Sequence, residues 1–200
     1  MRTIFVALVG ILVVSGCGGK TEPSCSPMKE IATSSLVKNG DTWDVAITSN
    51  IPAPVDKVLE AAQHPERGNE LVPDSILKSE MVSENGATKT LDIVARLDVL
   101  PPGFKVQNVR TEYTYFPQEK KFTSKSIDFK LADITSEYKL EPSSDGQGTV
   151  IKFTQKSKDK APMIVESLQK GALCEQFAIQ MRVIRRALNI DLPDRPPPNS

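Results

Sequence analysis

The chain has 200 residues, of which 39% are hydrophobic and 25% charged, and its 25 basic side chains balance its 25 acidic ones. This balance excludes the strong positive charge that a nucleic acid or an acidic membrane surface would attract. The length and composition indicate one globular domain with a real core and exclude a largely disordered chain.

The first residues have the arrangement of an export signal. Arg2 precedes the apolar run 4–14, which is shorter than the about 20 residues that cross a bilayer. A basic start, a short apolar segment and then small residues are typical of a signal that is cleaved off. The alternative to the lipoprotein signal described next is an ordinary secretory signal followed by a chance cysteine.

The residues Val-Ser-Gly-Cys at 14–17 resemble the bacterial lipobox, in which the chain is cut before the cysteine and the cysteine is acylated. The resemblance implies that residues 1–16 are removed and that Cys17 carries palmitate-like chains. Two or three such chains are enough for stable anchoring in a membrane. Gly18 is not the aspartate that retains lipoproteins in the inner membrane of enteric bacteria. We therefore expect a protein that faces the periplasm, in the outer rather than the inner membrane.

Residues 17–40 are expected to form a lipidated tether and N-terminal extension, because the segment 18–26 is polar and lacks periodicity. The chain has two further cysteines, Cys25 and Cys174. In an oxidising periplasm the two could form a disulfide. Alternatively, Cys174 is a small buried side chain and Cys25 is a free thiol without a function.

After residue 40, apolar and polar residues alternate in several segments, the pattern of half-buried strands. A helix is expected in PAPVDKVLEAAQ, and a second short helix or turn in HPERGNEL. Short turns join the strands, which favours an antiparallel meander. The expected strands cover residues 43–51, 76–82, 90–99, 109–115, 122–129, 134–140 and 150–155.

The end of the chain changes character after Ala161-Pro162. Apolar residues then recur every three to five positions from Ile164 to Leu188. This pattern predicts an amphipathic helix of about 25 residues, or about 38 Å. Residues 191–200 are rich in proline and are expected to form an extended, mobile tail.

This order of elements is an α+β layout, and the chain resembles the START-like superfamily, which includes the polyketide cyclase/dehydrase and birch-pollen-allergen families. The similarity rests on SNIPAPVDKVLEAAQHPERGNELVPDS, on SEYKLEPSSDGQGTVIKFTQK and on the terminal amphipathic helix. It implies a helix-grip fold over residues 41–190. In this fold a curved antiparallel sheet wraps around the long C-terminal helix, and two short helices follow the first strand.

The resemblance also implies a cavity, because a curved sheet cannot contact a straight helix along its whole length. Apolar walls with a few hydroxyls suit a lipid, a sterol-like molecule or a polyketide-like molecule. The alternative is a filled core that binds nothing. The expected lining consists of Leu91, Ile93, Leu97, Tyr113, Tyr115, Ile134, Tyr138, Leu140, Ile151, Phe153, Phe177, Met181 and Ile184.

Residues for catalysis are scarce. The single histidine, His64, lies in a polar loop. The sequence has no zinc-binding spacing, no Gly-rich phosphate loop and no GxSxG motif. Inward-facing Tyr113 and Tyr138 are the candidates for cyclase-like chemistry, although a buried tyrosine is more often structural. We therefore expect no metal, no cofactor and no catalytic residue.

Together these features predict a monomeric, membrane-anchored lipoprotein that binds or transfers a hydrophobic small molecule or lipid. The loop around Pro101-Pro102-Gly103 is a candidate gate to the cavity. A first alternative is a module with a filled core whose outer surface docks an envelope partner. A second alternative is a cyclase- or hydrolase-like enzyme.

Overall fold

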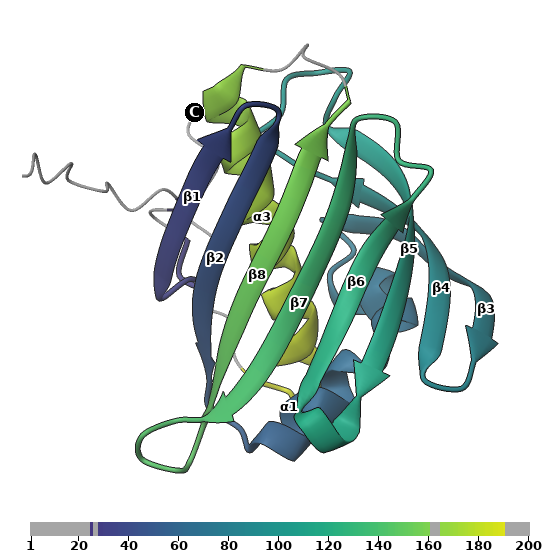
Figure 1. Cartoon of the computed structure of the whole chain (residues 1–200). Helices are drawn as coiled ribbons and strands as arrows, with labels where there is room; N and C mark the ends of the chain where they lie inside the picture. Colours follow the sequence, from purple (N-terminus) through teal and green to yellow (C-terminus); the bar gives the residue numbers. More distant parts are fainter. Residues whose placement is uncertain (1–24, 26–27, 161–164, 191–200) are drawn as a thin grey trace, which may run out of the picture.

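Eight antiparallel strands form one curved sheet in the order β1-β2-β8-β7-β6-β5-β4-β3 (Figure 1). The structure is a computed structural model, and it describes Cys25, residues 28–160 and residues 165–190. The elements in chain order are β1 (Thr33–Asn39), β2 (Thr42–Ile51), α1 (Val55–Ala62), the 3₁₀ turn η1 (Pro65–Arg67), α2 (Gly68–Leu71), β3 (Ile76–Asn85), β4 (Thr88–Arg96), β5 (Val106–Phe116), the 3₁₀ turn η2 (Pro117–Glu119), β6 (Lys121–Ile127), β7 (Ala132–Pro142), β8 (Thr149–Asp159) and α3 (Glu166–Ala187).

Helix α3 crosses the concave face of this sheet (Figure 1). Its 22 residues correspond to a length of about 33 Å. Glu166 lies in its first turn, and Arg185 and Arg186 lie in its last turn, which suits the dipole of the helix. The α+β class and the helix-grip arrangement predicted from the sequence are confirmed, including the short helices α1 and α2 after the strand β2.

Strand β1 lies inside the expected N-terminal extension and was not predicted as a strand. It pairs with β2 over its whole length through a tight turn in which Gly40 has a φ of +64°, a conformation that favours glycine. Leu36 is the buried residue of β1, so the strand has little apolar alternation. The Asn39-Gly40 pair was the available signal, because Asn-Gly marks a hairpin turn.

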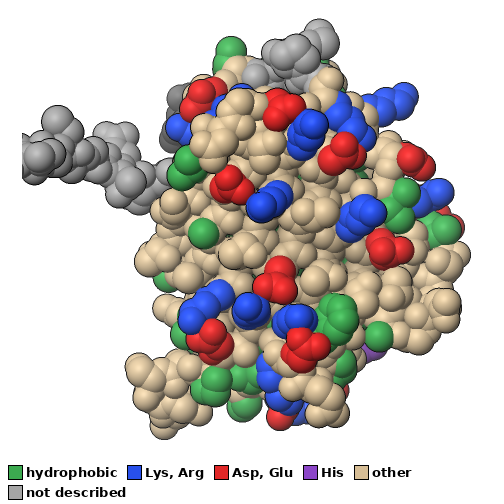
Figure 2. Space-filling model, in the orientation of Figure 1, with side chains coloured by type: hydrophobic (Ala, Val, Ile, Leu, Met, Phe, Trp, Pro, Cys, Tyr) green, Lys and Arg blue, Asp and Glu red, His purple; other side chains and the backbone are tan. Residues whose placement is uncertain are grey.

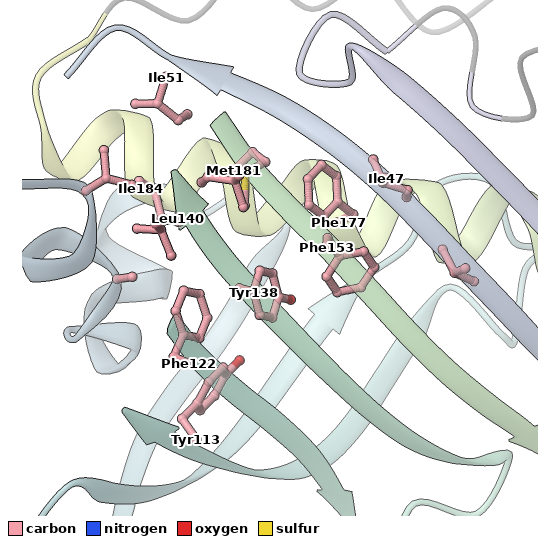
Figure 3. Packing of buried hydrophobic residues seen from close by; sticks show 14 of the residues in the cluster. Ile47, Ile51, Tyr113, Phe122, Tyr138, Leu140, Phe153, Phe177, Met181 and Ile184 are labelled. Carbon is pink, nitrogen blue, oxygen red and sulfur yellow. The ribbon is translucent and has the colours of Figure 1, made fainter. Parts of the chain in front are cut away.

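One half of the space between α3 and the sheet is filled by large apolar side chains (Figure 3). Ile51, Leu140, Met181 and Ile184 are each at most 4% exposed. Helix α1 adds the buried Val58 and three further apolar residues to this cluster. Dense packing of this kind leaves no room for a ligand at this end of the helix.

The convex face of the sheet carries interleaved basic and acidic side chains (Figure 2). Examples are the ion pairs between Lys152 and Glu141, at 2.6 Å, and between Lys139 and Glu137, at 3.4 Å. Such a face is suited to water rather than to a second apolar layer. No helix among the described residues has the length and apolar character needed to cross a bilayer.

Candidate functional site

A cavity of about 190 Å³ lies between α3 and the concave side of strands β4 to β8. Most of its wall is apolar, and serine, threonine, glutamine and tyrosine side chains interrupt it. The principal lining residues are Trp43, Ile93, Ala95, Leu97, Leu100, Val109, Thr111, Tyr113, Ser124, Ser126, Phe129, Leu131, Ala132, Ile134, Tyr138, Ser157, Asp159, Gln169, Leu173, Gln176, Ile179, Gln180 and Val183.

Small hydroxyl side chains on the inner face of the sheet account for the empty space. Ser124 of β6 pairs with Tyr113 of β5 on one side and with Ser136 of β7 on the other. One step along the strands, Ser126 pairs with Thr111. These side chains reach much less far from the sheet than a phenylalanine would, so the helix opposite them meets no filling side chain.

A row of aromatic rings forms the boundary between the packed half and the cavity (Figure 3). Phe122 and Tyr138 stack with their ring centroids 4.3 Å apart. Tyr138 contacts Phe153 at 4.8 Å, and Phe153 contacts Phe177 of α3 at 5.0 Å. Ring contacts at these distances stabilise the core beyond their buried area. The row therefore belongs to the packed core, and Tyr138 is its member that lines the cavity.

Two tyrosines, Tyr113 and Tyr138, contribute to the cavity wall. The hydroxyl of Tyr138 points away from Leu140 and the packed half (Figure 3). The Tyr113 hydroxyl has no hydrogen bond to another described residue. Burial raises the pKa of Tyr113 to about 12 and also raises the pKa of Tyr138. Both hydroxyls are therefore neutral hydrogen-bond donors at physiological pH.

A polar network forms part of the cavity wall near the start of α3. The Gln169 Oε1 atom accepts hydrogen bonds from Lys38 Nζ at 2.9 Å and from Trp43 Nε1 at 3.2 Å. The Gln169 amide nitrogen donates to Asp159 Oδ2 at 3.1 Å, and Lys38 Nζ lies 3.4 Å from the same oxygen. The charge of Asp159 is thus compensated within the wall.

The loop between β4 and β5, residues 97–105, covers another side of the cavity. Leu100 is 4% exposed and lines the wall. The backbone N–H of Val99 donates to the Glu175 carboxylate at 3.1 Å. A Cβ atom on Gly171 would lie 3.4 Å from the Val99 side chain, which places the loop next to α3 at this position. The loop predicted as a gate therefore does border the cavity.

The structure divides the lining residues expected from the sequence into two groups. The first group lines the cavity: Ile93, Leu97, Tyr113, Ile134 and Tyr138. The second group lies in the packed core outside the cavity: Leu91, Tyr115, Leu140, Ile151, Phe153, Phe177, Met181 and Ile184. The Tyr115 hydroxyl, for example, donates to the Ala62 carbonyl at 2.8 Å. Large apolar residues fill space, so most of them mark the core rather than the opening.

The lining residues that sequence reasoning missed include small and amide ones, as well as apolar ones such as Trp43, Val109 and Ile179. Ser124 and Ser126 alternate in phase with the buried Phe122 in the strand KFTSKSI, and this phase was the signal that could have identified them. Gln176 and Gln180 line the cavity from α3, but an amide on an amphipathic helix is usually read as solvent-facing.

Several other expectations concern positions outside the cavity. Cys25 and Cys174 form a disulfide with Cα atoms 5.4 Å apart. The exposed His64 ring lies 2.9 Å from the Glu66 carboxylate, and the described residues contain no cluster of side chains able to hold a metal. The acylation site Cys17, the signal at 1–16 and the tail at 191–200 lie outside the described residues.

Comparison with known proteins identifies the fold through structure rather than sequence. No family model and no curated protein matches the sequence significantly. The protein TTHA0849 from Thermus thermophilus matches with a TM-score of 0.62 and 19% identity, over 73% of this chain and 97% of that protein. The Zhui aromatase/cyclase from a Streptomyces species matches with a TM-score of 0.57 and 13% identity, over 72% and 95% of the two chains.

A START superfamily protein from Mycobacterium smegmatis also matches, with a TM-score of 0.57 and 12% identity, over 73% of this chain and 97% of that one. Identities this low establish a common fold and carry no activity from one protein to another. The described part of the chain therefore has the same fold as these proteins, a curved antiparallel sheet around a long C-terminal helix.

Proposed function

We propose that this protein is a lipid-anchored binding protein of the bacterial envelope, which holds a hydrophobic small molecule or lipid between α3 and the sheet. The cavity is the observation that carries the proposal. Its wall is mainly apolar and includes a few converging hydroxyl and amide groups, the combination found in small-molecule sites. A filled core, the alternative for an interaction module, would have no such space.

The size of the cavity limits the ligand. Its 190 Å³ is below the roughly 300–1,000 Å³ of typical small-molecule sites. A compact molecule or a single alkyl chain would fit the closed form. A sterol-sized ligand requires the 97–105 loop to move away from α3.

The disulfide supports a location outside the cytosol, since such bonds persist in oxidising compartments. It also bears on the anchor. Cys17 precedes Cys25 by eight residues, which span at most about 29 Å when extended. An acylated Cys17 would hold Cys25, which is bonded to Cys174 of α3, within that distance of the membrane surface, where a lipid ligand is available.

Binding is better supported than catalysis by the groups in the wall. In the described part of the chain, the titratable lining residues are Tyr113, Tyr138 and Asp159. Both tyrosines have raised pKa values, so neither is a base near neutral pH. Asp159 is held by Lys38 and Gln169. A cyclase-like reaction would need an acid and a base free to reach the substrate.

The proposal is tested with the delipidated protein and the fluorescent probe N-phenylnaphthylamine. The wild-type protein should bind the probe with enhanced emission. Ile134→Trp fills the cavity and should weaken binding about tenfold or more. Thr135→Trp is the matched control, because Thr135 is the next residue of β7 and is exposed on the opposite face. No binding to the wild type, or equal loss in the two variants, would refute an internal site.

A further inference from the structure

Polar side chains beside the aromatic row form a line across four neighbouring strands. Tyr113, Ser124, Ser136 and Gln155 are successive cross-strand partners on β5, β6, β7 and β8. Ser136 donates to Gln155 Oε1 at 3.1 Å. Of these four residues, Tyr113 and Ser124 line the cavity, as does Tyr138. Three hydroxyl-bearing side chains of the cavity wall therefore come from neighbouring positions on β5, β6 and β7.

The Tyr113 hydroxyl is the donor of this line that a ligand could reach. The Tyr113 residue is 6% exposed and lines the cavity, and its hydroxyl has no hydrogen bond to a described residue. A ligand that fills the space beside this hydroxyl must offer it an acceptor, because a donor buried without a partner is unfavourable. A ligand oxygen placed against Tyr113 would do so and could also contact Ser124, the cross-strand neighbour.

The wall provides no positive charge for an anion. In the described chain no lysine, arginine or histidine lines the cavity. The nearby Lys38 is engaged by Gln169 and Asp159. Lys89, which pairs with Tyr113 across β4 and β5, instead donates to the Gln63 carbonyl at 2.8 Å. A buried carboxylate or phosphate would therefore be uncompensated, which is costly in an apolar site.

We infer that the cavity selects an uncharged amphiphile, with a hydroxyl or carbonyl oxygen at Tyr113 and Ser124 and its hydrocarbon part towards Val109 and Leu100. The inference rests on the proposed function and adds to it the charge of the ligand and the direction in which it lies. Alcohols, ketones and esters of hydrophobic chains satisfy it. Free fatty acids and phospholipid headgroups do not.

The test compares three probes of equal chain length: decanol, decanoate and decane. Titrations at pH 8 follow the emission of the single tryptophan, Trp43, which lines the cavity. Decanol should bind at least about tenfold more tightly than decanoate, since a buried unpaired charge costs more than one hydrogen bond. Decane should bind more weakly than decanol by about fivefold to tenfold.

Tyrosine variants show whether the ligand oxygen lies at the Tyr113 hydroxyl. Tyr113→Phe should weaken decanol about fivefold to tenfold and leave decane unchanged. Tyr115→Phe is the matched control, because it removes a buried hydroxyl that is bonded to Ala62 outside the cavity. It should leave both affinities unchanged.

Each alternative result is decisive. Decanoate binding as tightly as decanol, or equal effects of Tyr113→Phe and Tyr115→Phe, would overturn the inference and leave the binding function intact. Binding of decanol and decane with the same affinity would also overturn the inference and leave the binding function intact. If no probe binds, including N-phenylnaphthylamine, the binding function itself fails and the inference fails with it.

Discussion

The Glu175 carboxylate accepts a hydrogen bond from the backbone N–H of Val99 at 3.1 Å, across 76 positions of sequence. Glu175 is 4% exposed, and hydrogen bonds to a charged group are the stronger ones. The contact holds the 97–105 loop against α3, next to Leu100 in the cavity wall. It therefore links the helix to the candidate gate.

Removing this contact should loosen the loop. Glu175→Ala leaves the Val99 amide without its acceptor, and hydrogen exchange at Val99 should accelerate about tenfold or more. Glu166→Ala is the control, because Glu166 lies on the same helix in an exposed ion pair with Lys170. Unchanged exchange at Val99 in Glu175→Ala would show that other contacts hold the loop.

The disulfide should contribute substantially to stability. It closes a loop of 149 residues, and cross-links of this length stabilise proteins by about 2–5 kcal/mol. The double variant Cys25→Ala and Cys174→Ala should lose this amount in urea unfolding. Dithiothreitol should destabilise the wild type by a similar amount and leave the double variant unaffected. A wild type that is insensitive to the reductant would contradict the prediction.

The tyrosines should make the protein sensitive to alkali. All three tyrosines of the chain have pKa values raised by burial, with that of Tyr113 at about 12. A raised folded-state pKa gives stability that is complete below pH 10 and falls as the pH rises towards 12. Each tyrosine contributes up to about 1.4 kcal/mol per pH unit to this fall.

Absorbance near 295 nm measures the ionisation of the tyrosines directly. Little tyrosinate should form in the folded protein at pH 10 to 11, and most of the signal should appear together with loss of circular dichroism. Tyrosinate that forms at pH 10 without unfolding would show that the hydroxyls are open to water.

The anchor is tested by replacing one atom. Cys17→Ser removes the thiol that acylation requires and should move the protein from the membrane fraction to the soluble fraction. Cys25→Ser is the control, because it removes a thiol that pairs with Cys174, and it should leave the protein in the membrane fraction. Membrane association that survives Cys17→Ser would contradict lipidation at this position.

The fold could be predicted because its signals are strong and local. The alternation around Leu91 and Tyr113 marks inner strand faces, and the spacing from Ile164 to Leu188 marks α3. Strand β1 was not predicted because Leu36 is its only buried residue. Its position depends on pairing with β2 rather than on its own pattern.

The cavity was harder to predict for a physical reason. Its location depends on where side chains are too small to meet the helix, as at Ser124 and Ser126 opposite α3. Sequence periodicity shows that a residue faces inward, but not whether the space in front of it is filled. Phe177 and Ile134 both face inward, yet only Ile134 borders the cavity.

Native mass spectrometry of the full-length protein, extracted from its own membrane, tests the central claim most directly. We predict a mass that includes acyl groups on Cys17 and a second, non-covalent increment that is lost on denaturation. The Ile134→Trp variant should lack the second increment, and Thr135→Trp should retain it. A native mass equal to the denatured mass in the wild type would contradict the proposal that the cavity holds a hydrophobic ligand.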